Sequence, residues 1–138
     1  MPRPANALIV DDEPHVRTFV RLLLKEVGIE ECWEAPDGAT ALELVARHRP
    51  QLLLLDVNMP RMNGMELLAK LREAQSDIPV VIVSAQSSLG IVNEAARLGA
   101  VGYVLKHSPK TESVEALRDV LDSLDETLDE DNGQAASG

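Results

Sequence analysis

Short apolar runs alternate with longer amphipathic patterns along the chain. The apolar runs predict strands at residues 7–10, 52–55, 80–83 and 101–105, and residues 30–35 are interpreted as a weaker strand. Two of them, Leu52 to Leu55 and Val80 to Val83, are apolar at every position. Uninterrupted apolar runs are typical of central strands that are covered on both faces. The strands therefore belong to a sheet with helices on both sides.

Between these runs, apolar residues recur at spacings of three and four, which predicts amphipathic helices. The first helix is expected from Pro14 to Gly28, because proline suits a first turn and glycine a C-terminal end. The Asp37-Gly38 pair is read as the turn that closes the second strand. The inward positions of three later helices are Leu42, Val45 and Ala46; Leu67, Leu68 and Leu71; and Val114, Leu117, Leu121, Leu124 and Leu128. Residues 89–98 predict a further, Ala-rich helix that ends at Gly99.

Five strand–helix units predict an α/β, three-layer sandwich, with a five-stranded parallel sheet and five helices. The last helix is expected to outrun such a sheet beyond about Leu121. We therefore expect Leu124 and Leu128 to be exposed and to form a contact site for a partner or a second copy.

The composition supports one folded domain and limits the cellular compartments in which the protein is expected. The chain has 138 residues, of which 45% are apolar, and this fraction is enough for a core. The chain is too short for a receptor joined to an effector. No apolar run approaches the roughly 18 residues that span a bilayer, and the N-terminus does not resemble a secretory signal. The single cysteine, Cys32, excludes an intramolecular disulfide. A cytoplasmic protein with no membrane partner is expected.

The net charge of −10 is unevenly distributed. Six acidic residues and no basic residue follow Leu121, and no basic cluster elsewhere could follow a nucleic-acid backbone. Direct binding of nucleic acid is therefore not expected. We assign residues 1–122 to the folded domain and 123–138 to the end of the last helix and an acidic, disordered tail.

Chemically active side chains follow the predicted strands directly: Asp11, Asp12, Asp56, Ser84 and Lys106. Ligands of parallel sheets bind beyond the carboxyl ends of the strands. Three carboxylates at one edge require a positive partner, and Mg²⁺ with its preference for oxygen ligands provides one. Each residue alone could be a helix cap, a turn residue or a solvated surface residue, but together they suit the binding and transfer of a phosphoryl group.

The segments LIVDDEP, LLLLDVNMPRMNGMELL, VVIVSAQ and GYVLK, in this order over about residues 6–122, resemble the receiver domain of two-component response regulators. The resemblance implies a flavodoxin-like fold. It also implies that a sensor histidine kinase or a histidine phosphotransfer protein donates a phosphoryl group to Asp56. By the same resemblance, Asp11 and Asp12 hold Mg²⁺ together with Asp56 and the backbone carbonyl of Asn58, and Mn²⁺ can substitute.

The resemblance also assigns the residues that respond to phosphorylation. Ser84 corresponds to the switch hydroxyl, Lys106 to the lysine that contacts the phosphoryl group, and Tyr103 to the switch aromatic, although its position alone indicates only a half-buried strand residue. Asn58 and Gln86 are expected to flank the path of the hydrolytic water. The family often has proline after this lysine, with a cis peptide, whereas this chain has His107, for which we expect a trans peptide.

These features predict a stand-alone receiver that catalyses only its own phosphorylation and dephosphorylation. Its partners would be the phosphoryl donor and a downstream protein, with a homodimer through the last strand and helices as a further contact. A small aspartyl-nucleophile phosphoryl-transfer enzyme is the alternative, but it would need an acid where the chain has Asn58. A flavin carrier would need a phosphate-binding loop in place of the acidic residues 11–13. A scaffold without phosphorylation would not need the acidic set.

Overall fold

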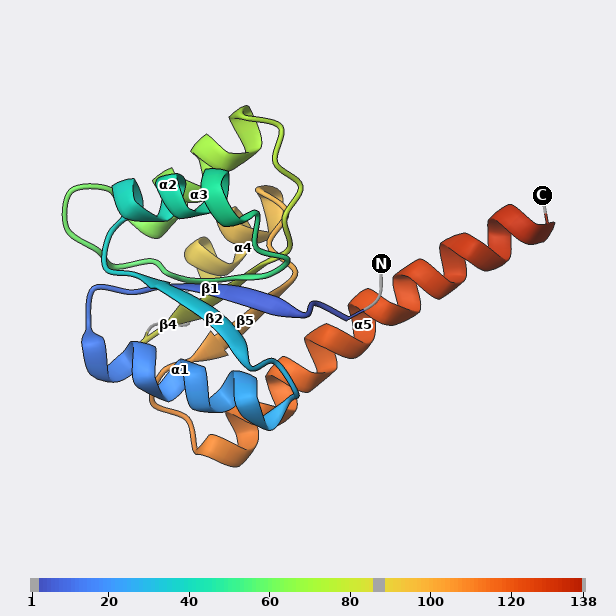
Figure 1. Ribbon diagram of the computed structural model, residues 1–138, viewed down its shortest axis with the longest axis horizontal. Coiled ribbons are helices and arrows are strands. Elements are labelled where there is room, and N and C mark those ends of the chain that lie inside the picture. Colours follow the sequence, from blue (N-terminus) through green and yellow to red (C-terminus); the bar gives the residue numbers. More distant parts are fainter. Residues whose placement is uncertain (1–2, 86–88, 138) are drawn as a thin grey trace.

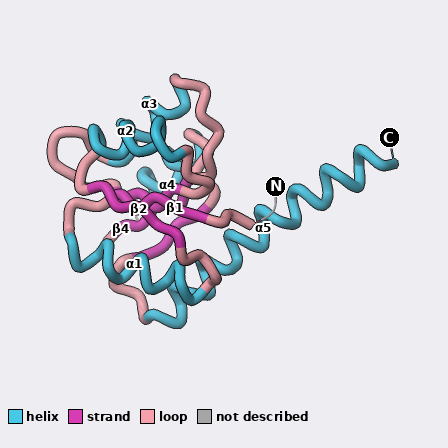
Figure 2. The backbone as a smooth tube through the Cα atoms, viewed as in Figure 1, coloured by secondary structure: helices cyan, strands magenta, loops and turns pink. Residues whose placement is uncertain are grey.

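The sheet has five parallel strands in the order β2-β1-β3-β4-β5. A computed structural model describes the backbone of residues 3–85 and 89–137, and the side chains as far as Asp125. Figure 2 shows the strands at the centre of the domain. Their bounds are β1 (Asn6–Val10), β2 (Glu31–Ala35), β3 (Leu53–Asp56), β4 (Val80–Ser84) and β5 (Gly102–Leu105).

Helices cover both faces of this sheet (Figure 1). One face carries α1 (Pro14–Glu26) and α5 (Lys110–Ser137), and the other carries α2 (Gly38–His48), α3 (Gly64–Glu73) and α4 (Leu89–Arg97). The predicted three-layer α/β sandwich is therefore confirmed.

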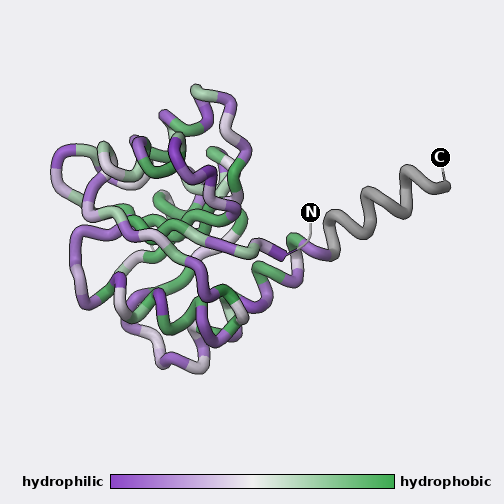
Figure 3. The backbone as a smooth tube through the Cα atoms, viewed as in Figure 1, coloured by the Kyte–Doolittle hydropathy of each residue, from purple (hydrophilic) through white to green (hydrophobic). Residues whose placement is uncertain are grey.

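Each face of the sheet has its own apolar core. Ile9, Leu54 and Val81 pack with α1 and α5, whereas their chain neighbours Leu8 and Leu55 pack on the opposite face. Successive strand residues point to opposite faces, so a strand between two helical layers needs apolar residues throughout. In Figure 3, hydrophobic stretches run along the strands at the centre of the domain.

Local sequence signals account for the ends of several helices. Pro14 begins α1, and Gly28 follows it with a φ of 92°, a conformation that glycine adopts without strain. Asp37 caps α2 by accepting a hydrogen bond of 2.8 Å from the Thr40 N–H. The Asp37-Gly38 pair therefore begins a helix and is not only a turn between two elements.

The predicted inward face of α2 was partly wrong. Ala46 is exposed, while Ala41 is fully buried and Leu42 and Val45 are half-buried. The helix begins at Gly38 and packs through a stripe that includes Ala41, one turn before Val45. Since each residue turns the helix by about 100°, Ala46 falls outside this stripe.

The expected exposure of Leu124 was also wrong, because Leu124 is half-buried and packs against the core between α1 and α5. The segment before β1 lies beside this part of α5, where Arg3 pairs with Asp122 and lies 3.7 Å from Asp125. Leu128 lies outside the described side chains. The backbone of α5 is helical as far as Ser137, and the disordered acidic tail stays a prediction.

Candidate functional site

The carboxyl ends of β1, β3 and β5 bring three charged side chains into contact. Asp11 directly follows β1, Asp56 ends β3, and Lys106 directly follows β5. Lys106 Nζ lies 2.9 Å from Asp11 Oδ2 and 3.2 Å from Asp56 Oδ1. All three side chains are at most 7% exposed, so their charges interact with little screening by water.

The charges of this group shift the pKa of two members. Burial and the neighbouring negative charge of Asp11 raise the pKa of Asp56 to about 6, although Lys106 partly offsets the increase. Burial alone would lower the pKa of Lys106, but its hydrogen bond to Asp11 and the charges of both carboxylates raise it. Lys106 is therefore held in its charged form, whereas Asp56 is ionised at a cost that a further cation would reduce.

Asp12 completes a group of three carboxylates that fits a small divalent cation. Ligand oxygens of Asp11, Asp12 and Asp56 lie within 4.8 Å of one another. Asp12 Oδ1 and Asp56 Oδ2 are buried and accept no hydrogen bond from any residue that the structure describes. Buried carboxylate oxygens without donors are costly, and hard cations such as Mg²⁺ bind such oxygens. The residues present therefore fit the expected Mg²⁺.

Backbone hydrogen bonds fix the orientation of two of these carboxylates. The Glu13 N–H donates to Asp11 Oδ1 at 2.8 Å, and the Asn58 N–H donates to Asp56 Oδ1 at 3.2 Å. Asn58 is thus beside the predicted phosphoacceptor. Its role as a carbonyl ligand stays a prediction.

Ser84 and Tyr103 lie on the neighbouring strands. Ser84 is buried at the end of β4, and β4 pairs with β5 so that Ile82 is opposite Tyr103 and Ser84 is opposite Leu105. Strand alternation places Ser84, Ile82 and Tyr103 on the same face of the sheet. Tyr103 is half-buried and packs with the core on the α4 side, as expected of a strand aromatic.

Two further expectations concern Gln86 and the peptide bond that follows Lys106. Gln86 lies outside the described residues. The described part of the chain contains no cis peptide, so the bond between Lys106 and His107 is trans, as the cost of a cis bond before a non-proline residue predicts.

Three residues near the site were not assigned a role in it from the sequence. Glu13 Oε1 lies 3.4 Å from Lys106 Nζ, Arg17 donates a hydrogen bond of 2.7 Å to the Asp11 carbonyl, and Gly64 packs on the backbone of Asp56. Glu13 could have been found from its position next to the acidic pair. Arg17 lies one turn into α1, and nothing in its local pattern separates it from a solvated arginine.

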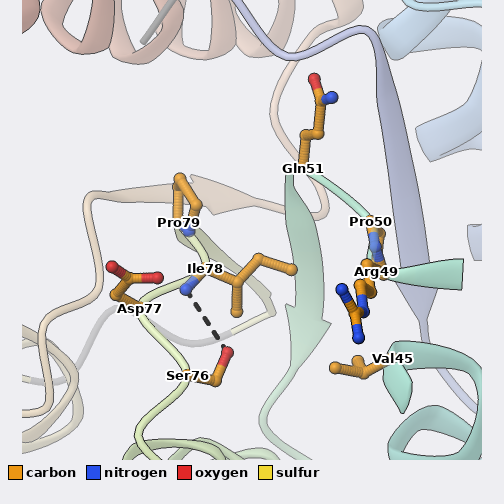
Figure 4. Close-up of a pocket in the computed structure, with 8 residues that line it drawn as sticks. All are labelled: Val45, Arg49, Pro50, Gln51, Ser76, Asp77, Ile78 and Pro79. Atoms are coloured by element: carbon orange, nitrogen blue, oxygen red, sulfur yellow. Dashed lines mark hydrogen bonds between the residues drawn. The ribbon is translucent and has the colours of Figure 1, made fainter. Parts of the chain in front are cut away.

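A separate cavity lies at the opposite end of the sheet, beside the residues that precede β3 and β4 (Figure 4). In Figure 4, the charged groups of Arg49 and Asp77 lie on opposite sides of it. It does not include the acidic group, and its lining is formed by Val45, Arg49, Pro50, Gln51, Ser76, Asp77, Ile78 and Pro79.

Comparison with known proteins agrees with the fold and shows the family of the chain. The family model of the response regulator receiver domain matches residues 7–118, and the chain belongs to this family. It is 39% identical over 115 residues to the nitrate/nitrite response regulator protein NarL of Escherichia coli, covering 83% of this chain and 53% of NarL. It is 38% identical over 117 residues to the glycerol metabolism activator of Pseudomonas putida, covering 83% of this chain and 52% of that protein. The chain thus spans about half the length of these curated relatives.

Solved structures show the same architecture. The REC domain of AraT, a response regulator from Geobacillus stearothermophilus, matches with a TM-score of 0.77 and 31% identity, covering 93% of this chain and 99% of that domain. The chemotaxis protein CheY4 of Vibrio cholerae matches with a TM-score of 0.74 and 30% identity, covering 85% of this chain and 98% of CheY4. The resemblance to receiver domains of two-component signalling is therefore confirmed. Among the described residues, no helix combines the length and the hydrophobicity that are needed to span a bilayer.

Proposed function

We propose that Asp56 accepts a phosphoryl group from a sensor histidine kinase or a histidine phosphotransfer protein in the cytoplasm. The observation that carries this proposal is the contact of the Asp56 carboxylate with Lys106 Nζ at 3.2 Å, inside a group of three carboxylates. Asn at position 58 counts against the alternative of an aspartyl-nucleophile enzyme that uses a second acid there.

The two oxygens of Asp56 have different surroundings. Oδ1 is held by Lys106 and by the Asn58 N–H, whereas Oδ2 has no hydrogen-bond donor among the described residues. In our proposal one oxygen of this carboxylate attacks phosphorus and forms the new P–O bond, while the P–N bond of the donor phosphohistidine breaks. The leaving imidazole nitrogen then keeps the electron pair and takes up a proton.

The same residues could hold Mg²⁺ during this transfer. Asp11, Asp12 and Asp56 are the proposed carboxylate ligands, with the Asn58 carbonyl as a further one. The bound ion would neutralise the negative charge that builds up between the carboxylate and the phosphoryl oxygens. Lys106 contributes a second positive charge from within the protein, and its raised pKa keeps it charged.

Phosphorylation would then change the face formed by the end of the sheet. The phosphoryl group adds about two negative charges and three acceptor oxygens beside Lys106. Ser84 lies on the adjacent strand and can donate its hydroxyl to one of these oxygens. Movement of Ser84 would alter the packing beside Ile82, and Tyr103 on the same face of the sheet could occupy the space. A downstream protein would recognise the altered surface.

Phosphorylation is expected to require a divalent cation and to occur on Asp56. Wild-type protein incubated with acetyl phosphate and Mg²⁺ should gain one phosphoryl group by intact mass, and peptide mapping should locate it on Asp56. EDTA should reduce this labelling at least tenfold, because the three carboxylates repel the anionic donor, and Mn²⁺ should restore it. Undiminished labelling in EDTA, or a phosphoryl group on another residue, would contradict the proposal.

A second expectation concerns self-association through β5. Leu105 is 38% exposed and lies opposite Ser84 in the sheet, so its surroundings should change upon phosphorylation. We expect beryllofluoride, a phosphoryl mimic, to raise the mass measured by light scattering in the wild type, and Leu105→Glu to abolish the increase. Leu22→Glu is the control, because Leu22 is 49% exposed on α1. The same mass for the wild type with and without beryllofluoride would exclude the dimer.

A further inference from the structure

We propose that Arg17 is a positioning residue that holds the peptide between Asp11 and Asp12 in the orientation that Mg²⁺ binding requires. This inference rests on the proposed function, since it concerns the same acidic group. Arg17 lies on α1 and contacts no oxygen of the group's carboxylates, so its effect passes through the backbone.

Arg17 makes two directed contacts from one guanidinium. Nη1 donates a hydrogen bond of 2.7 Å to the backbone carbonyl of Asp11, and Nε donates one of 2.9 Å to Glu34 Oε1. The side chain is 16% exposed, so water competes little for these bonds. A planar guanidinium with fixed donors restricts both partners more than a single ammonium could.

Glu34 is a firm anchor for this arrangement. It is the last residue but one of β2, and its second carboxylate oxygen accepts hydrogen bonds of 2.7 and 3.1 Å from Arg21. Burial alone would raise the pKa of Glu34, but the hydrogen bonds from Arg21 and Arg17 outweigh it and lower that pKa. Glu34 is therefore ionised and tied to α1 at two points.

The bond to the Asp11 carbonyl acts on both acidic residues at once. The carbonyl of Asp11 and the N–H of Asp12 belong to one planar peptide unit. A hydrogen bond that orients the carbonyl therefore also orients the backbone at Asp12. On its other side, the Asp11 N–H donates 3.1 Å to the Ala35 carbonyl at the end of β2. β2 and α1 thus hold Asp11 from both sides, and Arg17 is the residue that orients the following peptide.

Charge alone and positioning predict opposite effects on metal binding. Arg17 is a cation near the acidic group, so its removal should strengthen Mg²⁺ binding if only Coulomb repulsion mattered. If Arg17 orients the peptide, its removal should weaken Mg²⁺ binding despite the lost repulsion. Residues that orient metal ligands typically change affinity by 10–100-fold, and we expect roughly tenfold because Arg17 acts through the backbone.

The test is calorimetric titration of the intact protein with Mg²⁺ alone. Arg17→Met should raise the Kd for Mg²⁺ roughly tenfold, and the rate of labelling by acetyl phosphate should approach the wild-type rate at saturating Mg²⁺. A merely structural role would instead lower the maximal rate and leave the Kd unchanged. Arg17→Lys keeps the positive charge but lacks the planar guanidinium with its fixed donors, so it should give an intermediate Kd for Mg²⁺. If Arg17→Met does not fold, the same comparison with the wild type is made with Arg17→Lys.

Arg21→Met is the matched control. Arg21 has the same charge, lies on the same helix and binds the same Glu34, and neither of its two hydrogen bonds reaches Asp11. We expect its Kd for Mg²⁺ to stay within about twofold of the wild type. If both Arg17 variants had a Kd for Mg²⁺ equal to or lower than that of the wild type, the positioning role would be overturned and the proposed function would remain intact. A wild type that binds Mg²⁺ but is not labelled would contradict the proposed function and leave the positioning role standing.

Discussion

Replacing Asp56 by asparagine is expected to stabilise the metal-free protein while abolishing its phosphorylation. Burial and the charge of Asp11 raise the pKa of Asp56 from 3.8 to about 6. A shift of this size corresponds to about 3 kcal/mol of unfavourable free energy when the carboxylate is ionised. We expect asparagine to recover part of it, about 2 kcal/mol at pH 7.5, because the amide must still fit beside Lys106.

The effect should depend on pH in a definite direction. The pKa of Asp56 is higher in the folded protein than in the unfolded chain, so its contribution favours folding at low pH. That contribution is complete below about pH 4 and is lost as the pH rises through about 6. In EDTA, the difference in unfolding free energy between Asp56→Asn and the wild type should therefore grow from near zero at pH 4 to its full value near pH 7.

Urea denaturation in EDTA at several pH values measures this difference. Asp119→Asn is the control, because it makes the same chemical change on the exposed surface of α5. Added Mg²⁺ should stabilise the wild type and narrow its gap to the variant, since a ligand of the folded state raises the unfolding free energy. An Asp56→Asn protein that is no more stable than the wild type at pH 7.5 in EDTA would show that the carboxylate is not strained in the metal-free site.

The sheet and its reactive edge could be predicted because both depend on local pattern. Two uninterrupted apolar runs are enough to indicate buried parallel strands, and a polar residue at the end of such a run must lie at the carboxyl edge. Asp11, Asp56 and Lys106 were predicted to meet on this basis, and their side chains are in contact. The switch roles of Ser84 and Tyr103 came from the resemblance alone.

What could not be predicted depends on contacts between distant segments. Leu124 is half-buried because it packs against the core that includes residues of α1, more than ninety residues away along the chain, and Arg3 pairs with Asp122 on the same part of α5. The contact of Arg17 with the Asp11 carbonyl requires the exact placement of α1 against β2, which a periodic pattern does not encode. The error at Ala46 has a smaller cause, since a shift of one residue in a helix moves a side chain by about 100°.

Gly64→Ala is expected to damage both the stability of the protein and the phosphoacceptor. Gly64 begins α3 and donates a hydrogen bond of 2.9 Å to the Val57 carbonyl. A Cβ at this position would lie 2.2 Å from the backbone oxygen of Asp56 and 2.9 Å from the Cα of Val57. Neither atom belongs to a flexible side chain, so the backbone at the end of β3 would have to move.

We expect Gly64→Ala to cost about 3 kcal/mol of unfolding free energy, the upper part of the range for inserting an atom into a packed interior. Because the displaced backbone belongs to Asp56, labelling by acetyl phosphate with Mg²⁺ should slow by at least about tenfold even in the folded fraction. Gly90→Ala is the matched control, since an added Cβ on this α4 glycine meets nothing within 4 Å. It should leave the labelling rate unchanged and stabilise the protein by up to about 1 kcal/mol, as alanine favours a helix over glycine. If Gly64→Ala and Gly90→Ala behaved alike in urea denaturation and labelling, the close packing of α3 on Asp56 would not be what fixes the phosphoacceptor.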